Sequence, residues 1–315
     1  MFSLVIAFAI LLSGCKLSFT PATQTQPEAS YPALGSTEAA PTQVQAADPA
    51  PLPAAKETAA PTPTLPPTPT PTLEPFPLGP ASYPPGVNPL TGLAVSDPEK
   101  LKLPPALVSI TNFPVNARPP AGLSFTPFVF EMYIGEGATR FLALFYGEFP
   151  TQGEEGVGDD PARLPIDTIG PVRSGRLPYE PLRKQYNGFL VMASAASNVA
   201  AKLSAVSNIF GSDSGDINSA MIDATKLEQI ARSQQKNLDP ASLSGLLFDQ
   251  LPPQGGLPAK MIWIPYSYKN QIIWRFNAES GGYDRYQDQA DGKTFIQATD
   301  RINSSPLNYE NVVIL

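Results

Sequence analysis

The sequence FVFEMYIGEGATRFLALFY, residues 128–146, contains two apolar, aromatic runs separated by Gly135-Glu136-Gly137. Each run has the length and the aromatic content that β-strands prefer. The glycines on both sides of the break supply the backbone freedom that a tight turn needs. We therefore expect a β-hairpin of two buried strands within the folded region.

The segments around this hairpin alternate between strand-like and helix-like patterns. Upstream, the turn residues Asn88-Pro89-Leu90-Thr91-Gly92 precede a predicted strand. The strands predicted outside the hairpin are Leu107–Ile110, Gly188–Ala193, Met261–Tyr268, Ile272–Phe276, Tyr283–Tyr286 and Asn311–Leu315. The predicted helices are Glu180–Tyr186, Ser197–Val206, Thr225–Gln235 and Pro240–Phe248, the last with Asp239 as its N-cap.

This order of elements predicts an α/β fold of the α+β type. Mixed, layered sheets with packed helices are expected over residues 83–250. A break rich in proline and glycine follows, at residues 252–256. Residues 257–315 then read as the start of a mainly antiparallel β subdomain, because three strand-like runs follow one another at short intervals.

The N-terminus has the features of an export signal. Residues 2–12, FSLVIAFAILL, are apolar but too short to cross a bilayer core of about 30 Å as a helix. They suit the apolar region of a signal peptide. The next residues, Leu12-Ser13-Gly14-Cys15, resemble the lipobox of bacterial lipoproteins. That resemblance implies a signal peptide over residues 1–14, cleavage between Gly14 and Cys15, and lipid of the palmitate type on Cys15.

Two alternatives for this segment stay open. It could be a buried helix with a free thiol, or an uncleaved signal anchor. No Lys or Arg precedes the apolar run, which departs from the usual signal peptide. The lipoprotein interpretation places the protein at the cell membrane, lipid-anchored, on its extracytoplasmic face.

Residues 15–82 are rich in Pro, Thr and Ala and contain the run PTPTLPPTPTP at 61–71. Such a run is typical of polyproline II. The stretch is too poor in apolar side chains to offset the entropy of ordering it. We therefore expect a disordered linker that holds the folded region away from the membrane.

The composition excludes several classes of function. The net charge is −7 and no basic stripe is present, so we expect no nucleic-acid partner. The chain contains no histidine, which excludes Ser-His-Asp and Cys-His catalysis and most catalytic zinc sites. With one cysteine no internal disulfide can form. We expect no cofactor and no bound metal.

The strongest candidate site is a group of charged residues next to the predicted strands. Arginines with glycine neighbours can clamp a carboxylate or a phosphate. The alternative is that Arg–Glu pairs merely fix loops in an apolar domain. The candidate ligand-binding residues are Arg118, Glu131, Glu136, Arg140, Arg173, Ser174 and Arg176.

Other chemistries remain alternatives within or beside this group. Ser174 would need an activating base to act as a nucleophile, and Glu131 with Glu136 would form the carboxylate pair of a glycosidase. The oxygen-bearing run from Asp213 to Asn218 suits either calcium or Asx-turns. Tyr266, Tyr268, Trp274, Tyr283 and Tyr286 could form a sugar platform or pack inside a sheet.

The order of several short motifs resembles a bacterial family of unknown function, the YerB-like putative lipoproteins. The resemblance covers roughly residues 85–300. The motifs are Asn88–Gly92, Ile110-Thr111-Asn112, Ala117-Arg118-Pro119, Gly122-Leu123-Ser124, Glu131, Glu136-Gly137, Thr139–Ala143 and Ile169–Ser174.

The resemblance implies a mixed α/β fold and a role as a surface lipoprotein, but no reaction. In the family the C-terminal domain runs on for several more strands, so residues 257–315 are expected to be only part of it. Relatives tend to carry His and Gly where this chain has Met192-Ala193-Ser194-Ala195, which puts any site at that position in doubt.

Three functional hypotheses follow. The leading one is a non-catalytic binding or scaffold module of the cell envelope that recognises a wall component or an envelope protein. The alternative is a carboxylate-based hydrolase that acts on a cell-wall polymer. The third is a scaffold without a ligand.

Overall fold

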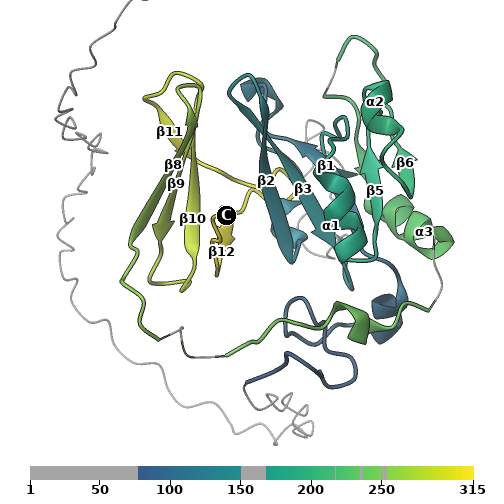
Figure 1. Ribbon diagram of the computed structural model, residues 1–315. Coiled ribbons are helices and arrows are strands. Elements are labelled where there is room, and N and C mark those ends of the chain that lie inside the picture. Colours follow the sequence, from purple (N-terminus) through teal and green to yellow (C-terminus); the bar gives the residue numbers. More distant parts are fainter. Residues whose placement is uncertain (1–76, 150–167, 217, 235–236, 250, 252–253) are drawn as a thin grey trace, which may run out of the picture. The chain divides into compact units, whose positions relative to one another are not determined.

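The computed structural model describes residues 77–149, 168–216, 218–234, 237–249, 251 and 254–315 (Figure 1). The proposed signal peptide, Cys15 and most of the linker lie outside the described residues. The described residues have the predicted mixed α+β fold, with two five-stranded sheets and one two-stranded sheet. None of the described helices is long and apolar enough to cross a membrane.

The central sheet has the strand order β2-β3-β1-β5-β6. The predicted hairpin is confirmed, since β2 (Phe128–Gly135) and β3 (Ala138–Phe145) pair antiparallel. Strand β1 (Ala106–Thr111) pairs antiparallel with β3 and parallel with β5 (Phe189–Met192). Strand β6 (Val206–Asn208) is parallel to β5. The carboxyl ends of β1, β5 and β6 therefore meet at one edge of the sheet.

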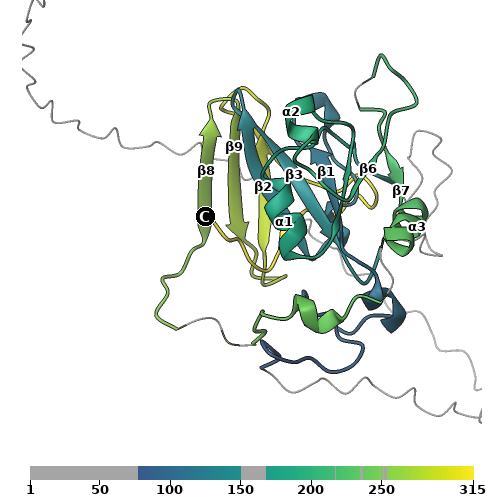
Figure 2. The same cartoon turned by 45° about the vertical axis from the view of Figure 1, so that its right-hand side comes forward.

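Alternate residues of these strands face opposite sides of the central sheet. One face packs against α1 (Tyr179–Gln185) and contains Leu107 and Leu142. The other packs against α3 (Ala224–Gln234) and contains Val108 and Phe141. Figures 1 and 2 show α1 in front of the central sheet, and Figure 2 shows α3 beside the short strand β7 (Ile222–Asp223). We call these sides the α1 face and the α3 face.

The second sheet is the predicted antiparallel meander. Its path is β11-β10-β9-β8, and β12 pairs with β10. The strands are β8 (Met261–Ser267), β9 (Asn270–Phe276), β10 (Tyr283–Asp288), β11 (Phe295–Gln297) and β12 (Asn308–Tyr309). The strand predicted at Asn311–Leu315 is wrong: the chain pairs at 308–309 instead, and Val313, Ile314 and Leu315 are exposed.

Two of the predicted helices are shorter than expected. Helix α2 covers only Ser197–Ala200, because Val206 adds a strand to the edge of β5. The 3-10 helix η4 covers only Pro240–Leu243. Its N-cap is Asp239, whose carboxylate accepts from the Ala241 N–H as predicted. It ends before Gly245, whose φ of 139° is incompatible with a continuing helix.

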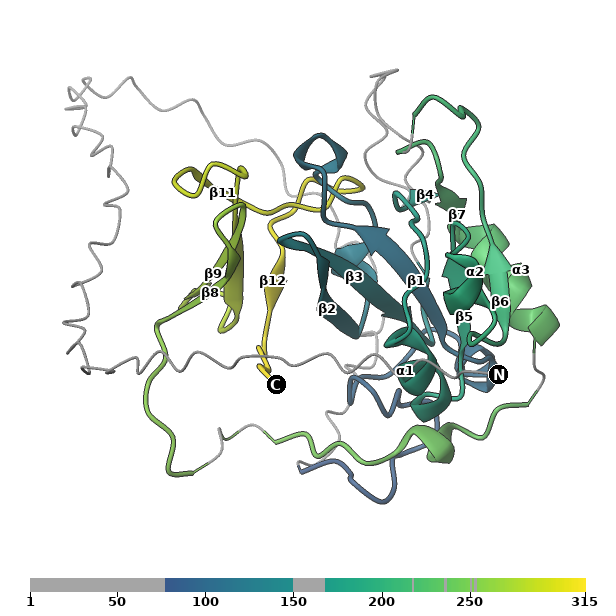
Figure 3. The ribbon, with the colours of Figure 1, turned by 45° about the horizontal axis from the view of Figure 1, so that its top comes forward.

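The remaining short elements connect the sheets. Strand β4 (Thr168–Ile169) pairs antiparallel with β7. The other 3-10 helices are η1 (Pro98–Lys102), η2 (Val115–Ala117) and η3 (Leu123–Phe125). Figure 3 shows β12 between β9 of the same sheet and β2, and the Tyr309 hydroxyl donates to the Leu123 carbonyl in η3.

Candidate functional site

The segment Gly170–Arg176 enters the central sheet at the carboxyl ends of β1 and β5. The parallel pairing of these strands ends at Val108 and Val191. Beyond that point the Arg173 N–H donates to the Ser109 carbonyl, and the Arg173 carbonyl accepts from the Ala193 N–H. The segment thus separates the two strands at the edge of the sheet where ligands bind in many α/β proteins.

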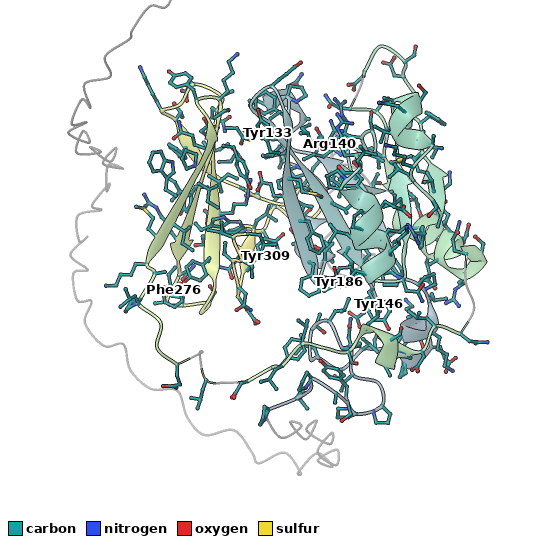
Figure 4. All side chains as sticks on the ribbon, viewed as in Figure 1. Tyr133, Arg140, Tyr146, Tyr186, Phe276 and Tyr309 are labelled. Carbon is teal, nitrogen blue, oxygen red and sulfur yellow. The ribbon has the colours of Figure 1, made fainter. Side chains whose placement is uncertain are left out.

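Arg140 lies at the start of β3 on the α1 face, opposite Thr111 of β1. Only 5% of the residue is exposed, and its Nη1 donates to the Ser174 carbonyl at 2.7 Å. Its Nε is buried and has no hydrogen-bond acceptor among the described residues. Figure 4 shows Arg140 at the end of the sheet away from Tyr146 and Tyr186. Burial lowers the pKa of Arg140 to about 10. The neighbouring Tyr179 hydroxyl opposes this lowering, whereas the charges of Arg176 and Arg173 add to it.

Arg176 and Arg173 lie beside this buried guanidinium. Arg176 Nη1 donates to the Gly175 carbonyl at 3.0 Å. Burial, followed by the charge of Arg176, lowers the pKa of Arg173. Neither Arg140 nor Arg176 forms an ion pair with a carboxylate in the described part of the chain. We call Arg140, Arg173, Ser174 and Arg176 the arginine cluster.

Ser174 contributes its carbonyl to the cluster. This oxygen accepts from Arg140 at 2.7 Å and lies 3.4 Å from both Arg176 Nη1 and the Ser109 hydroxyl. The Ser109 hydroxyl is also 3.2 Å from the Tyr179 hydroxyl. No hydrogen bond joins the Ser174 hydroxyl to a base among the described residues, so the geometry does not favour a serine nucleophile.

Glu131 lies on the other face of the sheet, because it pairs with Phe141 and not with Arg140. Its Oε2 accepts from Arg285 Nη2 at 3.0 Å. Its Oε1 accepts from the Thr139 hydroxyl at 2.6 Å and from Asn112 Nδ2 at 3.1 Å. Glu131 therefore holds the second sheet against the α3 face and is not part of the arginine cluster.

Arg118 belongs to the same inter-sheet network. Its Nε donates to the Asn112 carbonyl at 2.8 Å and its Nη1 to the Asp288 carbonyl at 2.6 Å. Burial lowers the pKa of Arg118 to about 10, and the charge of Arg285 adds to the effect. Sequence reasoning missed Arg285 and Gln287, because Tyr283 and Tyr286 are three residues apart and give β10 no period-2 pattern that marks a buried face.

Glu136 joins neither group. It is exposed in the turn between β2 and β3, with a φ of 54°. Glu131 is fully engaged by Arg285, Thr139 and Asn112, whereas Glu136 faces solvent. The two carboxylates do not form the facing pair that a glycosidase needs.

The residues proposed for a calcium site and for a sugar platform make local structural contacts instead. Asp213 Oδ1 accepts from the Gly215 N–H and Asp216 Oδ1 from the Asn218 N–H, which are Asx-turn contacts. The aromatic residues of the second sheet do not share one surface. Trp274 packs against Tyr309, whereas Tyr286 lies under Arg275 on the other side of the sheet.

Comparison with known proteins supports the motif-based resemblance. Residues 90–237 match the family model described as "Protein of unknown function (DUF3048) N-terminal domain". The fold is similar to the crystal structure of YerB protein from Bacillus subtilis, with a TM-score of 0.52 and 21% identity, over 70% of this chain and 71% of that chain. No curated protein matches the chain. Residues 90–237 are therefore similar to the DUF3048 N-terminal domain, whose function is unknown, and the described fold is YerB-like.

Proposed function

We propose that this protein is a lipid-anchored lipoprotein of the cell envelope whose folded region binds an anionic group at the arginine cluster. The anion is a carboxylate or a phosphate of a wall component or of another envelope protein. The linker holds this binding module away from the membrane surface. Catalysis is not part of the proposal.

The observation that supports binding is the buried, incompletely hydrogen-bonded guanidinium of Arg140. A buried donor without a partner costs about 1–3 kcal/mol. Here two further arginines lie beside it, which adds repulsion between like charges. An anion would accept from the Nε of Arg140 and offset the charges of Arg140 and Arg176.

The lipobox-like residues Leu12–Cys15 and the linker that follows them support the proposed lipid anchor. A single acyl chain binds a membrane only marginally, whereas two or more hold a protein stably. The negative net charge of −7 disfavours attachment through anionic lipid headgroups. Membrane attachment is therefore assigned to the lipid on Cys15.

Binding can be tested with the mature chain and two simple probes, inorganic phosphate and acetate. Isothermal titration should detect binding to the wild type. Arg140→Ala should weaken it by at least about tenfold, because a charge-assisted bidentate contact contributes about 1.5–3 kcal/mol. Arg232→Ala is the matched control, since Arg232 is an exposed arginine that pairs with Glu228. Equal affinities of all three proteins would overturn the arginine-cluster proposal.

The anchor can be tested by growing cells with a clickable palmitate analogue. The wild type should become labelled and stay with the membrane fraction, and Cys15→Ala should lose both properties. Persistent labelling of Cys15→Ala would show that the lipid is attached elsewhere.

A further inference from the structure

A hollow in the protein surface lies outside the arginine cluster. Its volume is 630 Å³, within the range of about 300–1,000 Å³ that small-molecule sites occupy. It lies where the loop after β6 meets η2, β4 and the segment after β11. The lining residues are Asn116, Thr168, Phe210, Ser212, Asp216, Asn218, Ser219, Met221 and Arg301.

The walls of this hollow are polar and balanced in charge. Arg301 and Asp216 supply one charge of each sign, and the other polar groups are neutral amides and hydroxyls. Such a lining does not select a strongly charged ligand, because either sign would meet a like charge. It offers both donors and acceptors to a neutral ligand with many hydroxyl groups.

Several of the polar groups are held in place before any ligand binds. Arg301 donates from Nε to the Pro119 carbonyl at 2.7 Å and from Nη2 to the Ala117 carbonyl at 2.9 Å. The Ser219 hydroxyl contacts the carbonyls of Asp213 at 2.8 Å and Asp216 at 2.7 Å. Preorganised groups lose little entropy on binding, which favours a specific ligand.

Two features of the hollow have no partner within the described residues. The Oδ1 of Asn218 is buried and accepts no hydrogen bond, although buried acceptors are normally satisfied. The ring of Phe210 is 71% exposed, which is unusual for a large apolar side chain. An exposed aromatic ring beside polar side chains matches a sugar, which has apolar C–H faces and hydroxyl edges.

We propose that this hollow binds a neutral saccharide unit. The sugar stacks a ring face on Phe210 and hydrogen-bonds polar side chains of the lining, among them Asp216 and Asn116. The inference goes beyond the anion site, because it uses none of the residues of the arginine cluster. A ligand that carries both a sugar and an acidic group would be able to use both sites.

The experiment is saturation-transfer NMR followed by titration on the mature chain. The probes are N-acetylglucosamine, its tetramer and methyl β-D-glucopyranoside, and glycerol is the control for a general polyol effect. At least one saccharide should receive saturation, and glycerol should not. Absence of transfer to every saccharide, or equal transfer to glycerol, would overturn the proposal.

Variants locate the binding. Phe210→Ala should weaken saccharide binding by up to about tenfold, since an aromatic contact contributes about 0.5–1.5 kcal/mol beyond its buried area. Phe276→Ala is the matched control, because Phe276 is a 47% exposed aromatic residue of the second sheet that does not line the hollow. An unchanged affinity of Phe210→Ala, or an equal loss in Phe276→Ala, would contradict the assignment.

The same titrations separate this inference from the proposed function. Arg140→Ala should lose phosphate binding and keep saccharide binding, and Phe210→Ala should show the reverse. Loss of phosphate binding in Phe210→Ala, without any saccharide binding in the wild type, would mean that the hollow is an anion site and that the saccharide proposal is wrong.

Discussion

The arginine cluster shows how a single buried side chain can serve binding at the expense of stability. Arg140 is 95% buried in its strand, yet no described residue accepts from its Nε and two arginines lie nearby. Residues that are unfavourable for folding but are retained at an edge of a sheet are common in binding sites. A binding role for Arg140 therefore predicts an effect of substitution that an arginine with a purely structural role would not show.

Arg140→Met should leave the ligand-free protein equally stable or more stable, by up to about 1–2 kcal/mol, because a methionine of similar length needs no charge partner. The same variant should lose anion binding. Thermal unfolding with and without phosphate measures both effects. A structural arginine would behave differently: its replacement would destabilise the protein and phosphate would stabilise both forms equally.

Glu180 gives a prediction about pH. Two hydrogen bonds from Arg183, together with those from Ser204, lower the pKa of Glu180 to about 2. A carboxyl with a lowered pKa stabilises the fold above its unfolded pKa of about 4.3 and loses that contribution as the pH falls toward 2. The free-energy difference between wild type and Glu180→Gln should therefore be largest near neutral pH and shrink on acidification. Urea unfolding at several pH values measures it, and a difference that stays constant would rule out this ion pair as the cause.

At the scale of elements, the backbone conformation of the segment Gly170–Arg176 requires glycine at position 170. Gly170 has a φ of 144°, and a Cβ there would lie 2.8 Å from the Val172 nitrogen and 3.1 Å from the Ala220 carbonyl oxygen. Both neighbours are backbone atoms that cannot move away freely. The conformation that brings Arg173 and Arg176 to the edge of the sheet therefore requires a residue without a side chain.

Gly170→Ala should lower the free energy of unfolding by about 1–3 kcal/mol and weaken anion binding through displacement of the segment. Gly281→Ala is the control, since Gly281 also has a positive φ, 72°, but no atom lies within 4 Å of its added Cβ. Chemical denaturation of both variants measures the difference. Similar losses in the two proteins would mean that backbone strain alone, and not the close packing of the segment, explains the effect.

At the scale of the whole described region, one buried carboxylate joins residues that are far apart in the sequence. Asp300 is 0% exposed, and its oxygens accept from the N–H groups of Gly122 and Ser124 and from the Ser124 hydroxyl. It also accepts from the N–H of Ile302. Together with the Glu131–Arg285 ion pair, this carboxylate holds the second sheet against the loop that follows β1.

Asp300→Ala should destabilise the protein by about 2–4 kcal/mol, because it leaves several buried N–H groups without an acceptor. Asp249→Ala is the control, since Asp249 is exposed and caps only the Leu251 N–H. Denaturant unfolding with two spectroscopic probes should show a lower midpoint for Asp300→Ala alone. An equal effect of the two changes would contradict the role of Asp300 in joining the two sheets.

The sequence by itself determined the elements whose patterns are local. The hairpin of β2 and β3, the meander of the second sheet and the cap at Asp239 follow from strand periodicity and turn chemistry, and the structure confirms them. The short motifs were specific enough to indicate the YerB-like family. The sequence also identified arginines that lie together, Arg140, Arg173 and Arg176.

Only the tertiary structure decided which charged residues share a site. Glu131 and Arg140 belong to neighbouring strands, but their side chains face opposite sides of the sheet because their positions in the β2–β3 register differ by one residue. The parallel pairing of β1, β5 and β6 and the hollow beside Arg301 join segments that are distant in the chain. Such contacts depend on register and packing between remote residues, which no local pattern of amino acids encodes.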